Sequence, residues 1–379
     1  MTEIYLDNSA TTRVCEKAAQ KALYMMRTVF GNPSSVYSMG MDAEGEMRAA
    51  RKAVAKKLGC DEGEVFFTSG GTEANNLALL GGADAKKRLG KKIITTAIEH
   101  PSVLNAVKEL EKRGFETVIL PAGRDGKIRL CDLENSLDDS VIMVSVMLVN
   151  NETGAVQPVR EAAALTKRMA KNALFHCDMV QGFGKLAETA ASLNADLISV
   201  SGHKIHAPKG VGALFVRKGV RINSILFGGG QEKNLRSGTE NAPAIAAFGV
   251  AAEEIPDMKT TLEKMTALRN MLKASLSDID GMVFNSPDDG LAYILNFSVK
   301  GIPSEVMIHF LEGCGIYVSG GSACSKGGRS HALTAQGLAP EIVDSAIRVS
   351  FSKDTTKQEV EQLSRAVSQG AKILRRKKI

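Results

Sequence analysis

The sequence predicts an α/β protein, in which a large domain with a mostly parallel, seven-stranded sheet is joined to a smaller C-terminal domain of the α+β type. Short apolar runs alternate with amphipathic stretches over the first two-thirds of the chain. This pattern is typical of a parallel sheet covered by helices on both faces. Five of the apolar runs end abruptly in polar or ionisable residues. The length of 379 residues suits two unequal domains better than one small domain.

Each strand is expected where a short apolar run is bounded by polar or turn-forming residues. The expected strands are 65–68, 92–96, 117–120, 141–149, 174–178, 197–201 and 212–216. Amphipathic stretches predict helices at 72–88, 102–113 and 159–170, and the second of these opens with the start signal Pro101-Ser102. Because ligands gather at the carboxyl ends of such strands, the residues that follow each strand are the first place to look for chemistry.

The second domain is expected after a long helical stretch that begins near Asn241, with helices at 244–254 and 258–277. It is expected to contain a strand, a helix, a strand and a final helix at 355–374. We therefore assign 13–250 to the large domain. The small domain consists of 1–12 and 251–379 and carries the loop that contains Cys324.

Composition and charge exclude several classes of protein. Hydrophobic residues make up 44% and charged residues 24%, as in ordinary soluble proteins. The net charge of +6 comes from interleaved basic and acidic residues, so direct binding to nucleic acid is not expected. The longest strongly apolar run, 141–149, is too short to span a membrane, and the N-terminus lacks a signal-peptide pattern. Six cysteines without a CxxC pair argue against a disulfide framework or a zinc site and favour the reducing cytoplasm.

The most informative residues are a lysine and an aspartate that follow two expected strands. The strand at 197–201 continues into Gly202-His203-Lys204, and the strand at 174–178 ends in Asp178. A lysine amine can form a Schiff base with a carbonyl, and pyridoxal phosphate is the commonest carbonyl cofactor held in this way. A carboxylate opposite the pyridinium nitrogen keeps that ring protonated. A lysine on the surface after a buried strand is the simpler interpretation of an isolated lysine, but these two strand ends have informative neighbours.

Two of those neighbours follow other strands. Ser69-Gly70-Gly71-Thr72 lies between a strand and a helix, where glycines and free helix N–H groups can receive a phosphate. A simple turn with Thr72 as N-cap is the alternative. Ser201 could add a hydroxyl to the same phosphate. His100 follows a strand and could stack on a flat ring or relay protons, although a lone histidine is more often structural.

Three later features also indicate a site. The glycine-rich, polar segment 228–241 suits phosphate binding or a subunit contact. Cys324 lies among small and basic residues, and nearby Lys326 and Arg329 would favour its thiolate, so it is a candidate nucleophile. An incidental surface thiol is the alternative. Arg348 lies inside an apolar strand, where a substrate carboxylate is a natural partner for its guanidinium.

At these residues the chain resembles the NifS/IscS-type cysteine desulfurases, which have the aspartate-aminotransferase-like fold of the fold type I pyridoxal phosphate enzymes. The stretches that carry the resemblance extend over nearly the whole chain. They are 5–12, 31–35, 68–73, 99–100, 149–154, 176–181, 201–204, 236–241 and 321–324, together with Arg348.

The resemblance implies a cofactor site for pyridoxal 5'-phosphate. Its residues would be Gly71, Thr72, His100, Asp178, Gln181, Ser201, His203, Lys204 and Thr239. Lys204 would form the Schiff base, Asp178 would face the pyridinium nitrogen, Gln181 the phenolic oxygen, and His100 the ring. The remaining five would hold the phosphate, with Thr239 reaching it from the second subunit of a homodimer.

The resemblance also implies the reaction. Lys204, His100 and Cys324 would be catalytic, and Asn151 and Arg348 would bind the carboxylate of the substrate L-cysteine. The products would be L-alanine and a persulfide on Cys324, whose sulfur would pass to an acceptor protein, either an iron–sulfur scaffold or a tRNA-thiolating enzyme. One alternative is a selenocysteine lyase or another pyridoxal phosphate lyase or aminotransferase of the same fold. Another is a non-catalytic assembly scaffold.

Overall fold

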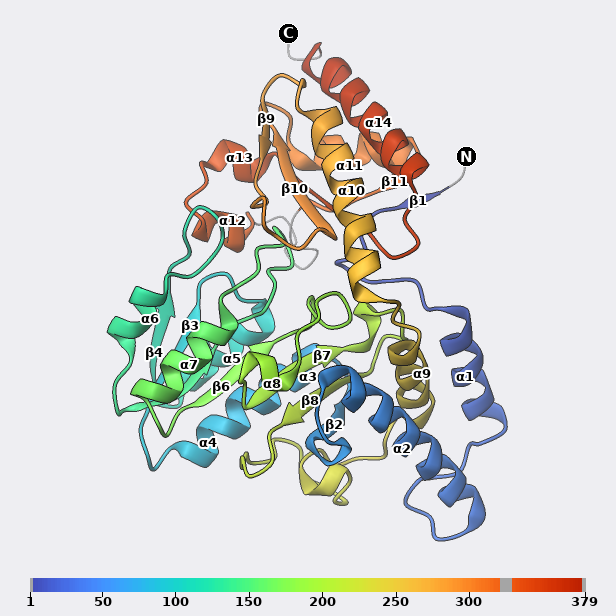
Figure 1. The fold of residues 1–379 in the computed structure, drawn as a ribbon, viewed down its shortest axis with the longest axis vertical. Coiled ribbons are helices and arrows are strands. Elements are labelled where there is room, and N and C mark those ends of the chain that lie inside the picture. Colours follow the sequence, from blue (N-terminus) through green and yellow to red (C-terminus); the bar gives the residue numbers. More distant parts are fainter. Residues whose placement is uncertain (1–2, 321–328, 377–379) are drawn as a thin grey trace.

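A computed structural model describes residues 3–320 and 329–376 of the chain. In this part of the chain, seven strands form one sheet in the order β2-β8-β7-β6-β5-β3-β4 (Figure 1). Strand β8 runs antiparallel to both of its neighbours, and the other pairs are parallel. The predicted mostly parallel, seven-stranded sheet is therefore confirmed. Its strands are β2 (Val65–Thr68), β3 (Lys92–Thr96), β4 (Glu116–Leu120), β5 (Val141–Ser145), β6 (Leu174–Asp178), β7 (Leu197–Ser201) and β8 (Gly212–Val216).

Five strands have the predicted bounds, but β5 ends at Ser145 although its apolar run was expected to continue to residue 149. The chain leaves the sheet because Val149 pairs with Val156 in an isolated bridge, and the N–H of Gln157 donates to the carbonyl of Leu148 at 2.9 Å. Residues 146–149 are nevertheless buried. Burial away from water, rather than membership of the sheet, accounts for their apolar character.

Helices cover both faces of this sheet, and alternate residues of one strand pack into different cores. Leu174 of β6 packs with residues of α3 (Gly71–Asn76) and α5 (Pro101–Lys112), whereas the next residue, Phe175, packs on the opposite side. Because side chains alternate between the two faces of a strand, a strand covered on both sides must be apolar throughout.

The helix expected at 72–88 is interrupted. It begins at Gly71 as α3, continues through a π-helical turn over Leu77–Gly81, and resumes as α4 (Gly82–Lys86). Helices α1 (Glu16–Arg27) and α2 (Ser38–Leu58), which the sequence analysis did not predict, pack with α9 (Ala242–Glu253) beside the sheet. The other helices of the large domain are α6 (Leu130–Ser136), α7 (Val159–Met169) and α8 (Ala190–Leu193).

The smaller domain lies above the large sheet in Figure 1 and contains a three-stranded antiparallel sheet in the order β12-β10-β9. It has more elements than the four predicted. They are β9 (Met282–Phe284), β10 (Ile294–Val299), β11 (Ile316–Tyr317), β12 (Ala346–Ser350), α10 (Met258–Leu276), α11 (Ser304–Gly313), α12 (His331–Ala335), α13 (Pro340–Asp344) and α14 (Lys357–Arg376).

The N-terminus of the chain joins this smaller domain. Strand β1 (Ile4–Tyr5) pairs in parallel with β11, and the side chain of Asn8 donates to the carbonyl of Ser350 at 2.9 Å. The next residues then pass down to the large sheet. The exact domain bounds of 13–250 and of 1–12 with 251–379 stay a prediction. Within the described residues, no helix combines the length and the apolar character that a membrane span requires.

Candidate active site

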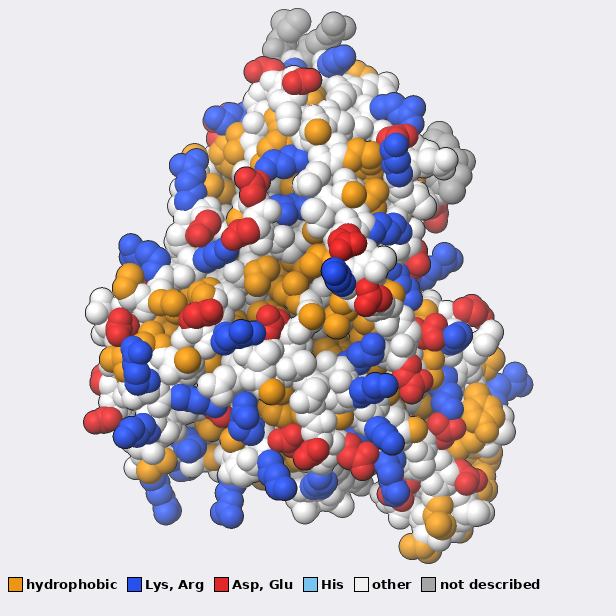
Figure 2. Space-filling model, viewed as in Figure 1, with side chains coloured by type: hydrophobic (Ala, Val, Ile, Leu, Met, Phe, Trp, Pro, Cys, Tyr) orange, Lys and Arg blue, Asp and Glu red, His pale blue; other side chains and the backbone are white. Residues whose placement is uncertain are grey.

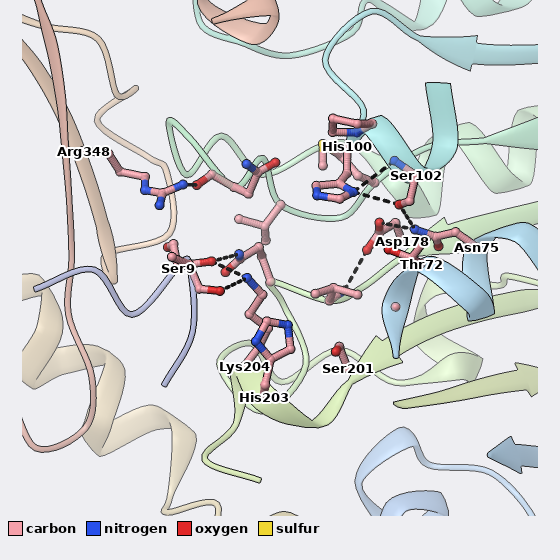
Figure 3. A pocket seen from close by; sticks show the side chains of 18 residues that line it. Ser9, Thr72, Asn75, His100, Ser102, Asp178, Ser201, His203, Lys204 and Arg348 are labelled. Atoms are coloured by element: carbon pink, nitrogen blue, oxygen red, sulfur yellow. Dashed lines mark hydrogen bonds between the residues drawn. The ribbon is translucent and has the colours of Figure 1, made fainter. Parts of the chain in front are cut away.

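A cavity of about 250 Å³ opens at the carboxyl ends of the central strands, between the sheet and the smaller domain. Side chains reach it from the N-terminal segment, from the start of α3 and α5, from the ends of β6 and β7, and from β12 (Figure 3). Ten of the predicted site residues line it. They are Gly71, Thr72, His100, Asn151, Asp178, Gln181, Ser201, His203, Lys204 and Arg348. Parallel strands bring their carboxyl ends to one edge, which is why residues far apart in the sequence meet here.

One predicted site residue that the structure describes, Thr239, is not among the residues that line this cavity. Its side chain is exposed. Cys324 and Lys326 lie outside the described residues. The expected influence of Arg329 on Cys324 stays a prediction; in the structure the guanidinium of Arg329 forms a two-pronged ion pair with Asp344, at 2.7 and 2.8 Å. A cation that already has a carboxylate partner stabilises a neighbouring thiolate less.

Lys204 ends a single 3-10 turn, Gly202–Lys204, that follows β7 directly. Its amine donates a hydrogen bond to the carbonyl of Ala10 at 2.9 Å and another to the carbonyl of Ser9. The N-terminal segment is held over the turn by Thr12, whose N–H and hydroxyl both donate to the carbonyl of His203 at 2.9 Å. Residues 9–12 therefore place two backbone acceptors next to the lysine.

A chain of hydrogen bonds connects Asp178 to His100. The amide nitrogen of Asn75 donates both to Asp178 Oδ2 and to the hydroxyl of Ser102, at 2.8 Å each. The hydroxyl of Ser102 lies 2.8 Å from His100 Nδ1, and the N–H of Ser102 donates to the same nitrogen at 3.1 Å. The N–H of Val180 donates to Asp178 Oδ1 at 3.0 Å. Figure 3 shows the four side chains of this chain on one side of the cavity.

This arrangement fixes the tautomer of His100. Because Nδ1 accepts the N–H of Ser102 as the N-cap contact of α5, the proton of the neutral ring resides on Nε2. Burial lowers the pKa of His100, and the charge of Lys204 lowers it further, whereas Asp178 raises it. Burial is the largest of these causes, so the imidazole faces the cavity as a neutral ring with one N–H donor at neutral pH.

Another part of the cavity wall is suited to a phosphate. Gly71, Thr72, Ser201 and His203 line both the cavity and an adjoining outer hollow. A Cβ on Gly71 would lie 2.8 Å from the Val180 side chain, so glycine leaves room there that another residue would fill. Burial and the charge of Lys204 lower the pKa of His203 to about 4. This histidine therefore offers a neutral ring beside the two hydroxyls.

Arg348 enters the cavity from β12 with its side chain almost fully buried. Its NH1 donates to the carbonyl of Asn151 at 3.0 Å, and its NH2 donates to Asp7 Oδ1 at 2.7 Å. Its Nε has no hydrogen-bond partner among the described residues. The guanidinium thus keeps unused N–H groups at the cavity wall, which suits a carboxylate ligand. The ion pair with Asp7 was not predicted.

Glu99, next to His100, is completely buried behind the cavity. Its Oε1 accepts the N–H of Met147 at 2.7 Å and the hydroxyl of Thr96 at 2.9 Å. No described residue donates to its Oε2. Burial, with a smaller contribution from the negative charge of Asp178, raises the pKa of Glu99 to about 8. The carboxyl group is therefore mostly protonated at neutral pH.

The donor set of the cavity fits pyridoxal phosphate. The cavity offers one amine, one carboxylate, a neutral histidine ring, and a glycine- and hydroxyl-lined end for a phosphate. The described residues contain no cluster of His, Cys, Asp and Glu side chains that could hold a metal ion. Sequence reasoning missed Asn75, Ser102 and Ser9. The position of Asn75, one helical turn after Thr72, could have revealed that it lies on the same helix face.

Comparison with known proteins gives a match to the family described as aminotransferase class-V over residues 4–363. The chain belongs to this family. A curated relative named cysteine desulfurase IscS, from Methanosarcina thermophila, is 39% identical over 380 residues, covering 98% of this chain and 93% of the relative.

Solved structures similar to this chain agree with this result. One titled NIFS-like protein has a TM-score of 0.92 and 36% identity, and the match covers 99% of this chain and all of the other. One titled SspA in complex with cysteine has a TM-score of 0.83 and 30% identity, with 94% and 100% covered. These findings confirm the predicted fold class, the resemblance to NifS/IscS-type cysteine desulfurases, and the class of pyridoxal phosphate-dependent enzyme that it implies.

Proposed function

We propose that this class-V aminotransferase family member is a cysteine desulfurase, which converts L-cysteine to L-alanine and leaves the sulfur as a persulfide on Cys324. One observation carries the proposal: a single cavity contains a lysine amine, a buried aspartate, a neutral histidine and a buried arginine. Relatives that carry the name cysteine desulfurase over nearly the full chain support the same reaction.

Pyridoxal phosphate, when bound, supplies a ring that takes up the charge released when the Cα–H bond of the substrate breaks. Lys204 would hold it covalently, with Asp178 at its ring nitrogen, Gln181 at its phenolic oxygen and His100 over its face. Gly71, Thr72, Ser201 and His203 would hold the phosphate.

Residues of the protein would bind the substrate and move its proton. Arg348 and Asn151 would orient the substrate through its carboxylate. The amine of Lys204, displaced by the incoming amino group, would take the proton from Cα. Its hydrogen bonds to the carbonyls of residues 9 and 10 keep this amine at the cavity wall.

Cys324 would carry the sulfur step. Its thiolate attacks Sγ of L-cysteine, a bond forms between the two sulfurs, and the bond from Cβ to sulfur breaks. The electron pair of the broken bond stays on Cβ, which takes up a proton and becomes the methyl group of L-alanine, and the proton held by Lys204 would return to Cα. The transferred sulfur remains as a persulfide that a sulfur-acceptor protein can remove. We propose an iron–sulfur scaffold or a tRNA-thiolating enzyme as that acceptor, and the cytoplasm as the location.

We further propose a homodimer, because large apolar side chains are exposed on one part of the surface. They lie on α1, in the loop between α1 and α2 and at the start of α2 (Figure 2), and Phe227 is a further exposed apolar residue next to the glycine-rich segment in the sequence. Their exposed fractions are high: Leu23 51%, Met26 57%, Phe30 65%, Val36 94%, Met41 63% and Phe227 89%. A two-fold contact would cover such surfaces and bring Thr239 to the phosphate end of a second subunit.

The test measures L-alanine and protein-bound sulfur after the cofactor-loaded protein meets L-cysteine. The wild-type protein should release L-alanine and gain the mass of one sulfur atom on Cys324. Cys324→Ser should keep the cofactor, release almost no L-alanine and gain no sulfur. Cys131→Ser removes an exposed cysteine of the described chain and should behave as wild type.

Two results would contradict the proposal. Near-normal alanine release by Cys324→Ser would instead indicate a selenocysteine lyase or a related lyase. A wild-type protein that binds no pyridoxal phosphate and releases no L-alanine would indicate a non-catalytic scaffold.

A further inference from the structure

Lys185 is a second buried lysine at this site, and the proposed reaction does not use it. It lies in the turn after β6 and is only 7% exposed. Its amine donates to Gln181 Oε1 at 3.2 Å and lies 5.6 Å from the centre of the Tyr293 ring. No described acidic side chain pairs with it. A buried lysine that contacts an amide and an aromatic ring, rather than a carboxylate, is costly for stability and calls for a functional reason.

The contact with Gln181 orients an amide that faces the cofactor. Because Lys185 donates to Oε1, the Nε2 end of Gln181 points the other way and donates to the carbonyl of Ser9 at 3.0 Å. Lys204 donates to that same carbonyl. Lys185 is therefore linked to Lys204 through one amide and one carbonyl. With this orientation, Gln181 presents N–H donors, as an acceptor such as the phenolic oxygen of pyridoxal phosphate requires.

The two lysines also share a small cavity on the side of Lys204 away from the large one. It encloses about 30 Å³, enough for one water molecule. The ionisable groups that line it besides the two lysines are His206, Glu254, Tyr293 and Lys353. Of these, only Glu254 is acidic, and its carboxylate pairs with Lys17 at 2.7 Å. The surroundings of the two amines are thus mainly positive or neutral.

The positive charge of Lys204 makes protonation of the Lys185 amine less favourable. Burial, together with the positive charges of Lys204 and Arg348, lowers the pKa of Lys185 to about 7. Two neighbouring amines in a site of low polarity cannot both be protonated easily, and a nearby cation is one of the known means of keeping a lysine nucleophilic.

We propose that Lys185 is a positioning residue of this enzyme, which holds the Gln181 amide with its N–H end toward the cofactor and, through its own charge, disfavours a second charge on the Lys204 nitrogen. This inference rests on the proposed function, because it requires pyridoxal phosphate bound at Lys204. It adds a group that acts through Gln181 and Lys204 and does not itself touch the substrate.

The first test uses the cofactor-free protein and Lys185→Met, which keeps the length of the side chain but removes the amine. In the folded protein the pKa of Lys185 is about 7, whereas the ordinary value is 10.5. The unfolded chain therefore holds a proton that the folded chain lacks between these two values, and the wild-type protein gains stability as the pH rises through this window.

Lys185→Met lacks this increase in stability with pH because it has no amine at position 185. Its melting temperature should exceed that of the wild-type protein most at pH 7, and the difference should shrink toward pH 10. Because the other ionisable groups are common to both proteins, the difference reports on Lys185 and on the Lys204 amine that it influences. Lys92→Met is the matched control: Lys92 is mostly buried as well, but it pairs with Asp138 away from the site, and its removal should give no such pH-dependent difference.

The second test titrates the absorbance of the protein-bound cofactor with pH. Removing a neighbouring cation favours protonation at the Lys204 nitrogen, so the midpoint in Lys185→Met should rise by about one pH unit. Lys185→Arg keeps a cation and a donor and should return the midpoint toward that of the wild type. In turnover, Lys185→Met should lower kcat more than it changes KM for L-cysteine.

The outcomes distinguish a failure of the role of Lys185 from a failure of the proposed function. If the wild-type protein binds pyridoxal phosphate but Lys185→Met has the same midpoint, the role of Lys185 is refuted while the proposed function stands. If Lys185→Met lacks the pH-dependent gain and shifts the midpoint, the inference is supported. If the wild-type protein shows no absorbance of lysine-bound cofactor at all, the proposed function itself fails.

Discussion

Arg348 and Asp7 form an ion pair that joins β12 to the N-terminal segment, with 2.7 Å between NH2 and Oδ1. The guanidinium side chain is 2% exposed and the carboxylate 18%. Asp7 is held in turn, since its backbone bridges to Ser350 and its carbonyl accepts the hydroxyl of Tyr5 at 3.1 Å. The arginine that faces the cavity is therefore neutralised and oriented before any substrate carboxylate arrives.

Arg348→Lys should weaken the binding of L-cysteine without changing the absorbance of the bound cofactor. Lysine can still pair with Asp7, but it lacks the planar fork that holds two carboxylate oxygens. Loss of one charge-assisted hydrogen bond corresponds to roughly a tenfold to hundredfold rise in KM. Steady-state kinetics and a cofactor absorbance spectrum check this. Unchanged affinity for L-cysteine would make Arg348 a structural partner of Asp7 only.

Lys204→Ala should abolish covalent capture of pyridoxal phosphate and the formation of L-alanine, while the fold is kept. Borohydride reduction followed by intact mass measurement should add one cofactor to the wild-type protein and none to the variant. Lys209→Ala is the control, because Lys209 lines the outer hollow at the phosphate end rather than the cavity itself. A Lys204→Ala protein that still turns over L-cysteine would show that the lysine is misassigned and would make Lys209 the next candidate.

Glu99 should impose a pH dependence on stability. Its folded pKa of about 8 lies above the ordinary value of 4.5. The folded protein therefore retains a proton that the unfolded chain loses, and stability from this group is present below pH 4.5 and is lost as the pH rises toward 8. Glu99→Gln cannot ionise, so its melting temperature relative to that of wild type should rise across this range. Parallel curves for the two proteins would show that Glu99 is ionised in the folded state.

Charges placed on the exposed apolar surface should separate the proposed dimer. Val36→Asp combined with Phe227→Asp should give the mass of a monomer in light scattering and bind pyridoxal phosphate more weakly, because Thr239 of a neighbour could no longer reach the phosphate. Leu89→Asp is the control, since Leu89 is another half-exposed apolar residue that lies outside this surface. A wild-type protein with bound cofactor and the mass of a monomer would refute the proposal.

Most of the cavity could be predicted from the sequence because its residues follow strands, and strands with both faces covered leave continuous apolar runs. The contacts between residues that organise the cavity could not be predicted from the sequence. Asn75 reaches Asp178 over 103 positions, and Asp7 reaches Arg348 over 341. Neither residue differs in its local sequence from an ordinary polar side chain, so only the folded chain reveals the pairing.

Helix α2 escaped prediction for a different reason. The buried face of α2 consists largely of small residues, among them Gly40, Ala43, Ala50 and Ala53. Small side chains let α9 approach closely, and a Cβ on Gly249 of that helix would lie 2.4 Å from the Cα of Ala50. Such a face gives little contrast in hydrophobicity along the sequence, and the helical period is correspondingly hard to see.

The pairing of the N-terminal segment with β11 and β12 has a consequence for synthesis on the ribosome. The hydrogen bond from Asn8 to the carbonyl of Ser350 cannot form until Ser350 has been synthesised, 342 residues later. At about 5–20 residues per second this delay is roughly 20–70 seconds. Until β11 has been synthesised, the backbone of β1 has no partner strand. The nascent large domain therefore lacks Arg348, which lines the cavity from β12, until most of the chain has been synthesised.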